Sequence, residues 1–150
     1  MVDSANALNF GYNVGSDTTL TLISNGVILS CSILTEFEAR QKTTELNSKA
    51  LDGINRFRHV EEGWDGTLGW DRSDSTLDDY FAAKEQGRYT GINPPAVSIV
   101  ETTADANTGL PSKYRYVGVT MKLDTIGRRG GDTKVDMRVS WSCSRREKVI

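Results

Sequence analysis

The chain of 150 residues contains two cysteines, and each lies between two serines, Cys31 in ILSCSIL and Cys143 in VSWSCSRR. Two thiols could form a disulfide, help to hold a metal, act as a nucleophile or pack in the core. A zinc site is not favoured, because two separated cysteines and one histidine lack the paired spacing of such sites. A nucleophile needs positive neighbours that lower the thiol pKa. Arg145 and Arg146 follow Cys143, but Arg145 shares its face only if the strand continues.

The other residues that could carry chemistry are a histidine and a group of acids. His59 lies two residues before Glu61 in RFRHVEE, and an exposed or interface histidine is a simpler interpretation than an acid/base pair. A Ser/His/Asp triad is not excluded by counting residues, but no Gly-x-Ser-x-Gly elbow is present. The aspartates between residues 65 and 79 lack the alternating pattern of a calcium loop. We therefore predict no catalytic residue, no cofactor site and no metal site.

Two further patterns have both a functional and a structural interpretation. GRRGG at residues 127–131 could cradle a phosphate, but it lies between two predicted strands rather than before a helix. A hairpin tip with two solvated arginines is the favoured interpretation. Trp64 and Trp70 flank DGTLG and could stack on sugars or bases. In a small β domain, tryptophans more often pack in the core or in a contact between subunits.

Composition limits the class of protein. A hydrophobic content of 37% in 150 residues predicts one domain, residues 1–150, with a single core. The 18 basic residues nearly balance the 20 acidic ones, which argues against a dedicated duplex-binding protein. No segment is apolar for long enough to span a membrane, and MVDSANALNF lacks the features of a signal peptide. We therefore expect assembly in a cytoplasm.

The N-terminal half predicts an arm, a hairpin and a loop. Residues 1–17 show no sustained period and predict an arm that is loose unless a partner holds it. The Asn25-Gly26 dipeptide lies between two apolar runs, which is a strong hairpin signal. Residues 40–55, RQKTTELNSKALDGIN, show neither the helical nor the strand periodicity of apolar residues, so they predict a long polar loop. RFRHVEEG and DGTLGWD then predict two short strands with a turn at residues 63–66.

The C-terminal half predicts one helix followed by regular strands. SDSTLDDYFAAKEQG predicts a helix at about residues 74–86, capped by Ser73 or Ser75 and closed by Gly87. Apolar residues alternate with polar ones in residues 114–123 and 133–144. The helix stripe comprises Leu77, Tyr80 and Phe81, and the two strand faces comprise Val117, Val119, Met121, Leu123, Val135, Met137, Val139, Trp141 and Cys143.

These elements predict a mainly β fold: a β-sandwich or β-barrel with one flanking α-helix at about residues 74–86 and a long polar loop at about residues 40–55. The run GWDGTLGWDRSDSTLDDYF, from Gly63 to Phe81, passes from a Gly-rich strand into a Ser/Asp-capped helix that ends in AAKEQG. Over roughly residues 18–144 this layout resembles the tail tube proteins of contractile-tailed bacteriophages.

The resemblance implies a structural protein rather than an enzyme. In that family, β-sheets from six subunits join into the inner barrel of a hexameric ring. Rings stack into a tube through which DNA and the tape measure protein pass, inside a sheath. The implied location is the virion tail, after assembly in the host bacterial cytoplasm. The alternatives are a secretion-system tube subunit, a tail terminator, or an isolated small-ligand-binding β-barrel or enzyme.

The resemblance also implies where subunits touch. The loop at 40–55 would reach an adjacent subunit or ring, and the N-terminal arm would lie on a neighbour. If the polar strand faces line the channel, acids such as Asp124 and Asp136 must offset the basic residues there, because DNA must slide without being held. Those basic residues are Lys122, Lys134 and Arg138. The implied inter-subunit residues are Arg40, Lys42, Glu45, Lys49, Leu51 and Asp52.

Both cysteines fall on the apolar faces of their predicted strands. Burial as two reduced thiols is therefore the leading interpretation. The alternative is a disulfide between Cys31 and Cys143, within a subunit or between ring neighbours, formed after the particle leaves the reducing cytoplasm. Arg145, Arg146 and Lys148 predict a basic tail that is free to contact a neighbour.

Overall fold

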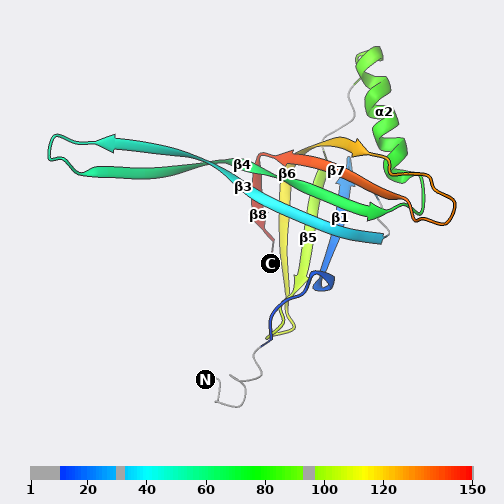
Figure 1. Ribbon diagram of the computed structural model, residues 1–150, viewed down its shortest axis with the longest axis horizontal. Helices are drawn as coiled ribbons and strands as arrows, with labels where there is room; N and C mark the ends of the chain where they lie inside the picture. The colour runs from blue at the N-terminus through cyan, green and yellow to red at the C-terminus, as the bar shows by residue number, and fades with distance from the viewer. Residues whose placement is uncertain (1–10, 30–32, 93–96, 150) are drawn as a thin grey trace.

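The computed structural model describes residues 11–29, 33–92 and 97–149. The chain is mainly β with one flanking α-helix, as predicted (Figure 1). No helix among these residues is long and apolar enough to cross a membrane. The elements in chain order are the short 3-10 helix η1 (Gly15–Asp17), β1 (Thr18–Ser24), β2 (Val27–Leu29), β3 (Ile33–Lys49), β4 (Asn55–Asp71), α2 (Thr76–Thr90), β5 (Val97–Ala104), β6 (Pro111–Thr125), β7 (Asp136–Cys143) and β8 (Arg145–Lys148).

The strands form one antiparallel sheet in the order β2-β1-β5-β6-β7-β4-β3, with β8 also paired to β6. β6 belongs to two parts of this sheet, because its N-terminal part pairs with β5 and β8 and its C-terminal part pairs with β7. We call the part with β2, β1, β5, β8 and the start of β6 the β1 half. The part with the end of β6, β7, β4 and β3 is the β7 half.

β6 changes its inward face at Gly118, which has φ +70°. The β5–β6 register shifts at this point, as expected of a bulge built on a residue without a Cβ. Tyr116 is buried before the bulge, and Val119 and Met121 are buried after it. The prediction that Val117 shares the inward face of Val119 is therefore wrong, because the bulge resets the alternation.

The core lies between the two halves of the sheet. From β7, the predicted residues Met137, Val139, Trp141 and Cys143 are all buried. Tyr116 of the β1 half touches Trp141 of the β7 half edge to face, with ring centroids 5.1 Å apart. The cluster also contains Leu22, Leu68, Trp70, Val97 and Ile99, and α2 adds Leu77 and Phe81 from its predicted stripe.

The helix begins and ends later than predicted. It runs through Gly87, which is buried, and ends at Gly91 with φ +81°. A left-handed residue after the last turn is the usual helix stop, and Gly91 provides it at no steric cost. At the other end Ser75 is the N-cap residue, but its side chain makes no cap hydrogen bond, and Asp74 Oδ1 accepts the Thr76 N–H at 3.1 Å.

The Asn25-Gly26 hairpin is confirmed: β1 pairs with β2, and both turn residues have positive φ. The described part of the N-terminal arm, residues 11–17, is held by its own subunit. The Gly11 N–H donates to Asn107 Oδ1 at 3.0 Å, and the Ala106 N–H donates to Asn13 Oδ1 at 2.7 Å. Residues 1–10 of the predicted arm lie outside the described residues.

Residues 40–55 are not an irregular loop, and β4 is not two short strands with a turn at residues 63–66. β3 and β4 are each 17 residues long and pair along their whole length. β7 ends at Cys143, opposite Trp64, so the outer part of this pair projects from the body (Figure 1). We call residues 42–62 the projecting hairpin. Both of its faces are solvated, so its sequence lacks the apolar alternation that usually reveals a strand.

Candidate functional site

The β7 half has one apolar face and one polar face. The alternate residues of β7 that point away from the core are Asp136, Arg138, Ser140 and Ser142, and none of them is buried. Directly paired residues share a face of a sheet, so the register extends this surface across three neighbouring strands. We call the resulting surface the polar face; it also includes Glu36, Glu38 and Arg40 of β3, Asp65 and Thr67 of β4, and Lys122 of β6.

Opposite charges are paired at one end of the polar face. Arg138 Nη1 lies 3.2 Å from Glu36 Oε1. Asp71 and Asp136 are direct cross-strand partners, and like charges in that position repel. Lys134 Nζ lies 3.4 Å from Asp71 Oδ1 and 3.5 Å from Asp136 Oδ1. Asp136 and then Asp71 raise the pKa of Lys134, so the lysine stays charged between them.

The predicted charge balance is thus present for two of the three basic residues. Asp136 lies beside Lys134, while Arg138 is balanced by Glu36. Asp124 instead accepts a hydrogen bond from the Ser140 hydroxyl. Among the described residues, Lys122 has no ion-pair partner.

Two of the predicted inter-subunit residues pair within their own subunit at the base of the hairpin. Arg40 Nε lies 3.7 Å from Glu38 Oε1 and 4.0 Å from Asp65 Oδ1. Lys42 Nζ lies 3.8 Å from Asp65 Oδ2. Arg40 and Lys42 therefore belong to the charge pattern of the polar face.

The projecting hairpin starts at a glycine bulge. The β3–β4 register shifts between Gln41 and Thr43, and Gly63, opposite this shift, has φ +99°. A Cβ on Gly63 would lie 2.5 Å from the Cys143 carbonyl oxygen. Only glycine therefore allows β4 to leave β7 at this point without a shift of the backbone.

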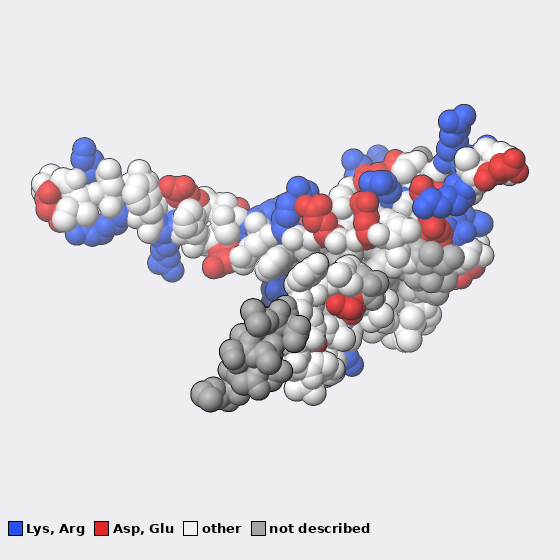
Figure 2. All heavy atoms as spheres, turned by 60° about the horizontal axis from the view of Figure 1, so that its bottom comes forward, with Lys and Arg blue, Asp and Glu red and all other residues white. Residues whose placement is uncertain are grey.

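Each face of the hairpin carries both apolar and polar side chains in its cross-strand pairs. Leu46 pairs with Arg58 and Thr44 with Val60 on one face. On the other face Asn47 pairs with Phe57, and Glu45 with His59. Figure 2 shows acidic and basic side chains interspersed along the hairpin and the adjoining body in that view, with no patch of one sign.

Several apolar side chains of the hairpin are exposed. Leu46 is 52% exposed, Phe57 60% and Ile54 55%, while Leu51 at the tip is fully exposed. Leu46 and Phe57 lie on opposite faces, and a two-stranded hairpin without a core is marginally stable in water. Glu45 lies midway along the hairpin, and Lys49, Leu51 and Asp52 lie near the tip.

The hairpin tip is closed by Asp52. Its Oδ1 accepts the Ile54 N–H at 2.9 Å, and its Oδ2 accepts from Arg56 Nη2 at 3.0 Å. The Arg56 hydrogen bond, followed by that of Ile54, lowers the pKa of Asp52. The tip is therefore a defined turn rather than an irregular loop.

Both edges of the β7 half lack a partner strand among the described residues. β3 pairs only with β4, and residues 120–125 of β6 pair only with β7. Beside this β6 edge, the Lys84 ammonium of α2 donates to the Met121 carbonyl oxygen. A groove of about 660 Å³ lies between helix and edge, lined by Phe81, Lys84, Glu85, Arg88, Tyr89, Met121, Lys122 and Leu123. We call it the α2 groove.

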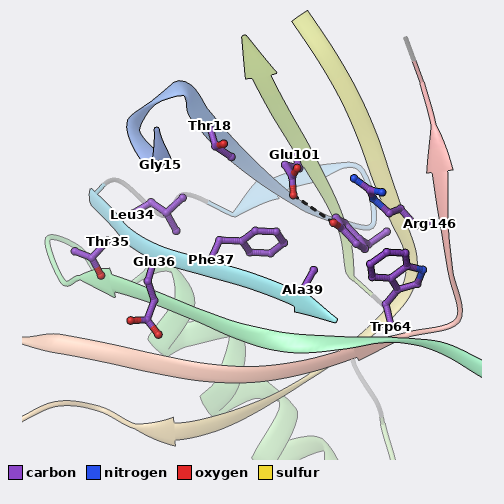
Figure 3. A pocket seen from close by; sticks show the side chains of 11 residues that line it. Gly15, Thr18, Leu34, Thr35, Glu36, Phe37, Ala39, Trp64, Glu101 and Arg146 are labelled. Atoms are coloured by element: carbon purple, nitrogen blue, oxygen red, sulfur yellow. Dashed lines mark hydrogen bonds between the residues drawn. The ribbon is translucent and has the colours of Figure 1, made fainter. Parts of the chain in front are cut away.

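A pocket of about 500 Å³ lies beside the opposite edge, between β3 and the β1 half (Figure 3). We call it the β3 pocket. The Tyr116 hydroxyl donates to Glu101 Oε2 at 3.2 Å, and burial, followed by the Glu101 charge, raises the pKa of Tyr116. Its lining includes Thr18, Leu34, Thr35, Phe37, Ala39, Trp64, Glu101, Tyr116 and Arg146.

Arg146 forms one wall of this pocket and is not part of a loose tail. Its guanidinium lies 3.7 Å from the centre of the Tyr114 ring and 5.1 Å from that of Trp64. Arg145–Lys148 form β8 and pair with β6. The predicted free basic tail is therefore wrong, because strand pairing and ring stacking attach it to the subunit.

Cys143 is buried, and burial raises the pKa of its thiol, which opposes nucleophilic chemistry. No disulfide joins it to a described residue. Cys31 lies outside the described residues, so the Cys31–Cys143 pairing stays a prediction.

The remaining chemical candidates lie apart from one another. His59 and Glu61 are exposed on the projecting hairpin, and GRRGG lies in the loop between β6 and β7. Trp70 is buried in the core, whereas Trp64 lines the β3 pocket. Among the described residues no group of His, Cys, Asp and Glu could hold a metal ion.

The fold matches chains from solved contractile injection systems. The first, at a TM-score of 0.63 and 7% identity, is in the structure of the anti-feeding prophage tube terminating cap, and the match covers 99% of this chain and 98% of that one. The second, at 0.61 and 8%, is in an extracellular contractile injection system, PVC, sheath-tube complex in the extended state, with 99% of each chain covered. The third, at 0.55 and 6%, is in the six-fold symmetrised anti-feeding prophage baseplate, covering 93% and 96%.

No family model and no curated protein matches the sequence. At these identities the likeness is one of fold, over almost the whole length of the chains compared. The chain thus has a fold found in the tube, cap and baseplate assemblies of contractile injection systems.

Sequence reasoning missed the α2 groove and the β3 pocket. Both are built from residues far apart in the chain, such as Lys84 with Met121 and Phe37 with Arg146. No local spacing of residues in the sequence could therefore predict them. The one available signal was the alternation in residues 114–123, which marks β6 as a strand but not as an edge.

Proposed function

We propose that the protein is the repeating subunit of the tube of a contractile phage tail or tail-like injection system, and that it has no enzymatic activity. The observation that carries this proposal is the form of the β7 half. Its four strands have an apolar face in the core, a charge-balanced polar face, and unpaired edges at β3 and β6. The fold likeness to sheath-tube and cap assemblies supports it.

The strand directions are compatible with a ring that closes by antiparallel pairing. The β7 half contains four strands in strict antiparallel order, so β3 and the end of β6 run in opposite directions. When β3 of one copy meets β6 of a copy in the same orientation, the new pair is also antiparallel. Such a head-to-tail contact repeats until the ring closes, and closure removes the open edges. Six copies per ring agree with the six-fold symmetry of one structural neighbour.

In such a ring the polar face lines the channel. Its acidic and basic side chains nearly balance and are largely paired within each subunit. Binding to duplex DNA depends on Lys and Arg side chains that are free to contact phosphates and displace the counterions of the DNA. A wall whose charges are paired therefore lets DNA and a tape measure protein pass without holding them. The sheath would surround the tube, and the location would be the tail of the particle.

The projecting hairpin then serves as the contact between neighbouring subunits or rings. It lies beyond the end of β7, it exposes apolar groups on both faces, and its tip is ordered by Asp52. Leu51, Lys49 and Glu45 are the predicted residues best placed to touch a neighbour.

A tube terminator is the second candidate, because one structural neighbour is in a tube terminating cap. Negative-stain microscopy and light scattering of the purified full chain test both proposals. A tube subunit gives stacked rings with a central channel whose length grows with concentration. A terminator gives single rings that do not stack. A chain that stays monomeric at every concentration overturns both.

A further inference from the structure

The α2 groove and the β3 pocket lie at opposite edges of the β7 half but on the same side of it. Met121 and Leu123 contribute the sheet wall of the groove, and Phe37 and Ala39 contribute that of the pocket. All four side chains belong to the core cluster or pack against it. Both hollows therefore lie on the apolar side of the sheet.

The two hollows also lie at the same height along the strands. Consecutive cross-strand partners connect Leu123, Val139, Leu68 and Phe37 in one row. The next row connects Met121, Trp141, Gly66 and Ala39. When β3 of one copy pairs with β6 of the next, the β3 pocket of the first copy faces the α2 groove of the second.

The surfaces brought together in this way are complementary. Tyr89, near the end of α2, is 76% exposed, and Arg88 beside it is exposed as well. The β3 pocket offers aromatic walls from Phe37 and Trp64 and a carboxylate from Glu101 (Figure 3). Aromatic and arginine side chains that enter pockets are the usual anchors of protein interfaces, and a pocket of about 500 Å³ has room for them.

We propose that the last turn of α2 of one subunit docks in the β3 pocket of the next subunit around the ring. Tyr89 inserts between the aromatic walls, and the Arg88 guanidinium faces Glu101. Each copy donates one helix end and accepts one, as a head-to-tail interface requires. This inference rests on the proposed ring, and it names the side chains that hold neighbouring subunits together.

Disulfide trapping tests the contact. In proteins whose native thiols are removed by Cys31→Ser and Cys143→Ala, a Tyr89→Cys variant and a Thr35→Cys variant are purified separately, mixed and oxidised. Thr35 is chosen because it is an exposed residue that lines the pocket. The mixture is expected to give a covalent dimer on a non-reducing gel, and each variant alone is expected to give none. A dimer from Tyr89→Cys alone indicates a helix-to-helix contact and overturns the proposal.

A charge reversal gives a second readout. Arg88→Glu should lower ring association by at least about tenfold, because the new carboxylate then faces Glu101 of the neighbouring subunit. Arg128→Glu makes the same change in charge at an exposed position in the loop between β6 and β7, outside α2, and is the matched control. Unchanged thermal unfolding shows that both variants fold. Normal assembly of Arg88→Glu overturns the proposal.

The failure of this inference is distinguishable from the failure of the proposed function. If the unmodified chain forms rings but the mixed variants give no covalent dimer, the helix contact is wrong and the ring stands. If the unmodified chain forms no rings, the proposed function itself is wrong.

Discussion

Phe37 and Trp141 stack face to face, with ring centroids 5.5 Å apart and ring planes 1° apart. Their strands are not neighbours, because β4 lies between β3 and β7. The stack forms next to Gly66, the direct partner of both Trp141 and Ala39. It ties the edge strand β3 into the core, although strand pairing connects β3 only to β4 among the described residues.

Gly66→Ala should destabilise the protein by about 1–3 kcal/mol, the usual cost of overpacking. A Cβ at this position would lie 1.8 Å from the Glu38 carbonyl oxygen and 3.0 Å from Trp141 Cζ2. The backbone of β3 must therefore move away from β4 at Glu38, and the Trp141 ring must give slightly as well. Urea unfolding followed by tryptophan fluorescence measures the change. Gly131→Ala is the control, because a Cβ there meets nothing; equal stabilities of the two variants would contradict the account.

Gly63→Ala should cost more than Gly53→Ala. Both glycines have positive φ, +99° and +82°, so both variants carry the strain of an alanine in that region. Only at Gly63 does the added Cβ also meet backbone, the Cys143 carbonyl oxygen at 2.5 Å. We expect about 1 kcal/mol at Gly53 and about 1–3 kcal/mol more at Gly63. Thermal unfolding compares them, and a larger loss at Gly53 would show that the bulge does not fix the hairpin.

Local sequence patterns predicted several parts of the fold correctly. The alternation in residues 133–144 predicted the buried face of β7, because one face of that strand lies in the core and the other in water. The Asn25-Gly26 turn and the helix stripe were equally local and were also correct. Each of these signals depends on a few neighbouring residues.

The errors have a common cause in long-range packing. Residues 40–55 have two solvated faces, so pairing between distant strands, rather than apolar periodicity, makes them β. Gly118 resets the face of β6 through a bulge that no local pattern reveals. Arg146 looked like part of a free tail, because its partners Tyr114 and Trp64 come from other strands. The candidate site was predicted in part. The balance of Lys134 by Asp136 was correct, whereas the two open edges and the hollows beside them could be located only once the strand order was known.

Arg146→Lys should lower stability by about 1 kcal/mol even though the charge is kept. The central carbon of the Arg146 guanidinium lies over both rings, 3.7 Å from the centre of Tyr114 and 5.1 Å from that of Trp64. A lysine ammonium cannot stack over two rings in this way. Hydrogen exchange of the β8 amides should accelerate together with the loss of stability. Arg145→Lys is the matched control, since Arg145 lies over no ring of the described residues and pairs with Glu147 instead. An equal effect there would contradict the role of stacking.

Acid should loosen the hairpin tip. The folded pKa of Asp52 is lowered, first by Arg56 and then by the Ile54 N–H, so its contribution is present above the unfolded pKa. That contribution is lost as the pH falls from about 4 through the lowered value. Hydrogen exchange of the Ile54 amide, corrected for the intrinsic pH dependence, should therefore rise in this range. Asp52→Ala, which removes the acceptor of the Ile54 N–H, should show fast exchange of this amide already at neutral pH. An exchange rate independent of Asp52 would refute the assignment.

Charge reversal on the polar face should turn a passive wall into one that holds DNA. Glu38 is exposed beside Arg40, so Glu38→Lys leaves Arg40 without that partner and adds a second cation in every subunit. Phosphate contacts made by such cations release counterions and strengthen binding as salt is lowered. Assembled Glu38→Lys rings should therefore retain duplex DNA in filter binding at low salt, with a steeper salt dependence than the unmodified protein. Asp132→Lys makes the same change in charge in the loop between β6 and β7, at an exposed position outside the polar face and the projecting hairpin, and should retain less. If both variants bind DNA equally, total charge rather than the polar face controls retention, and the face does not line the channel.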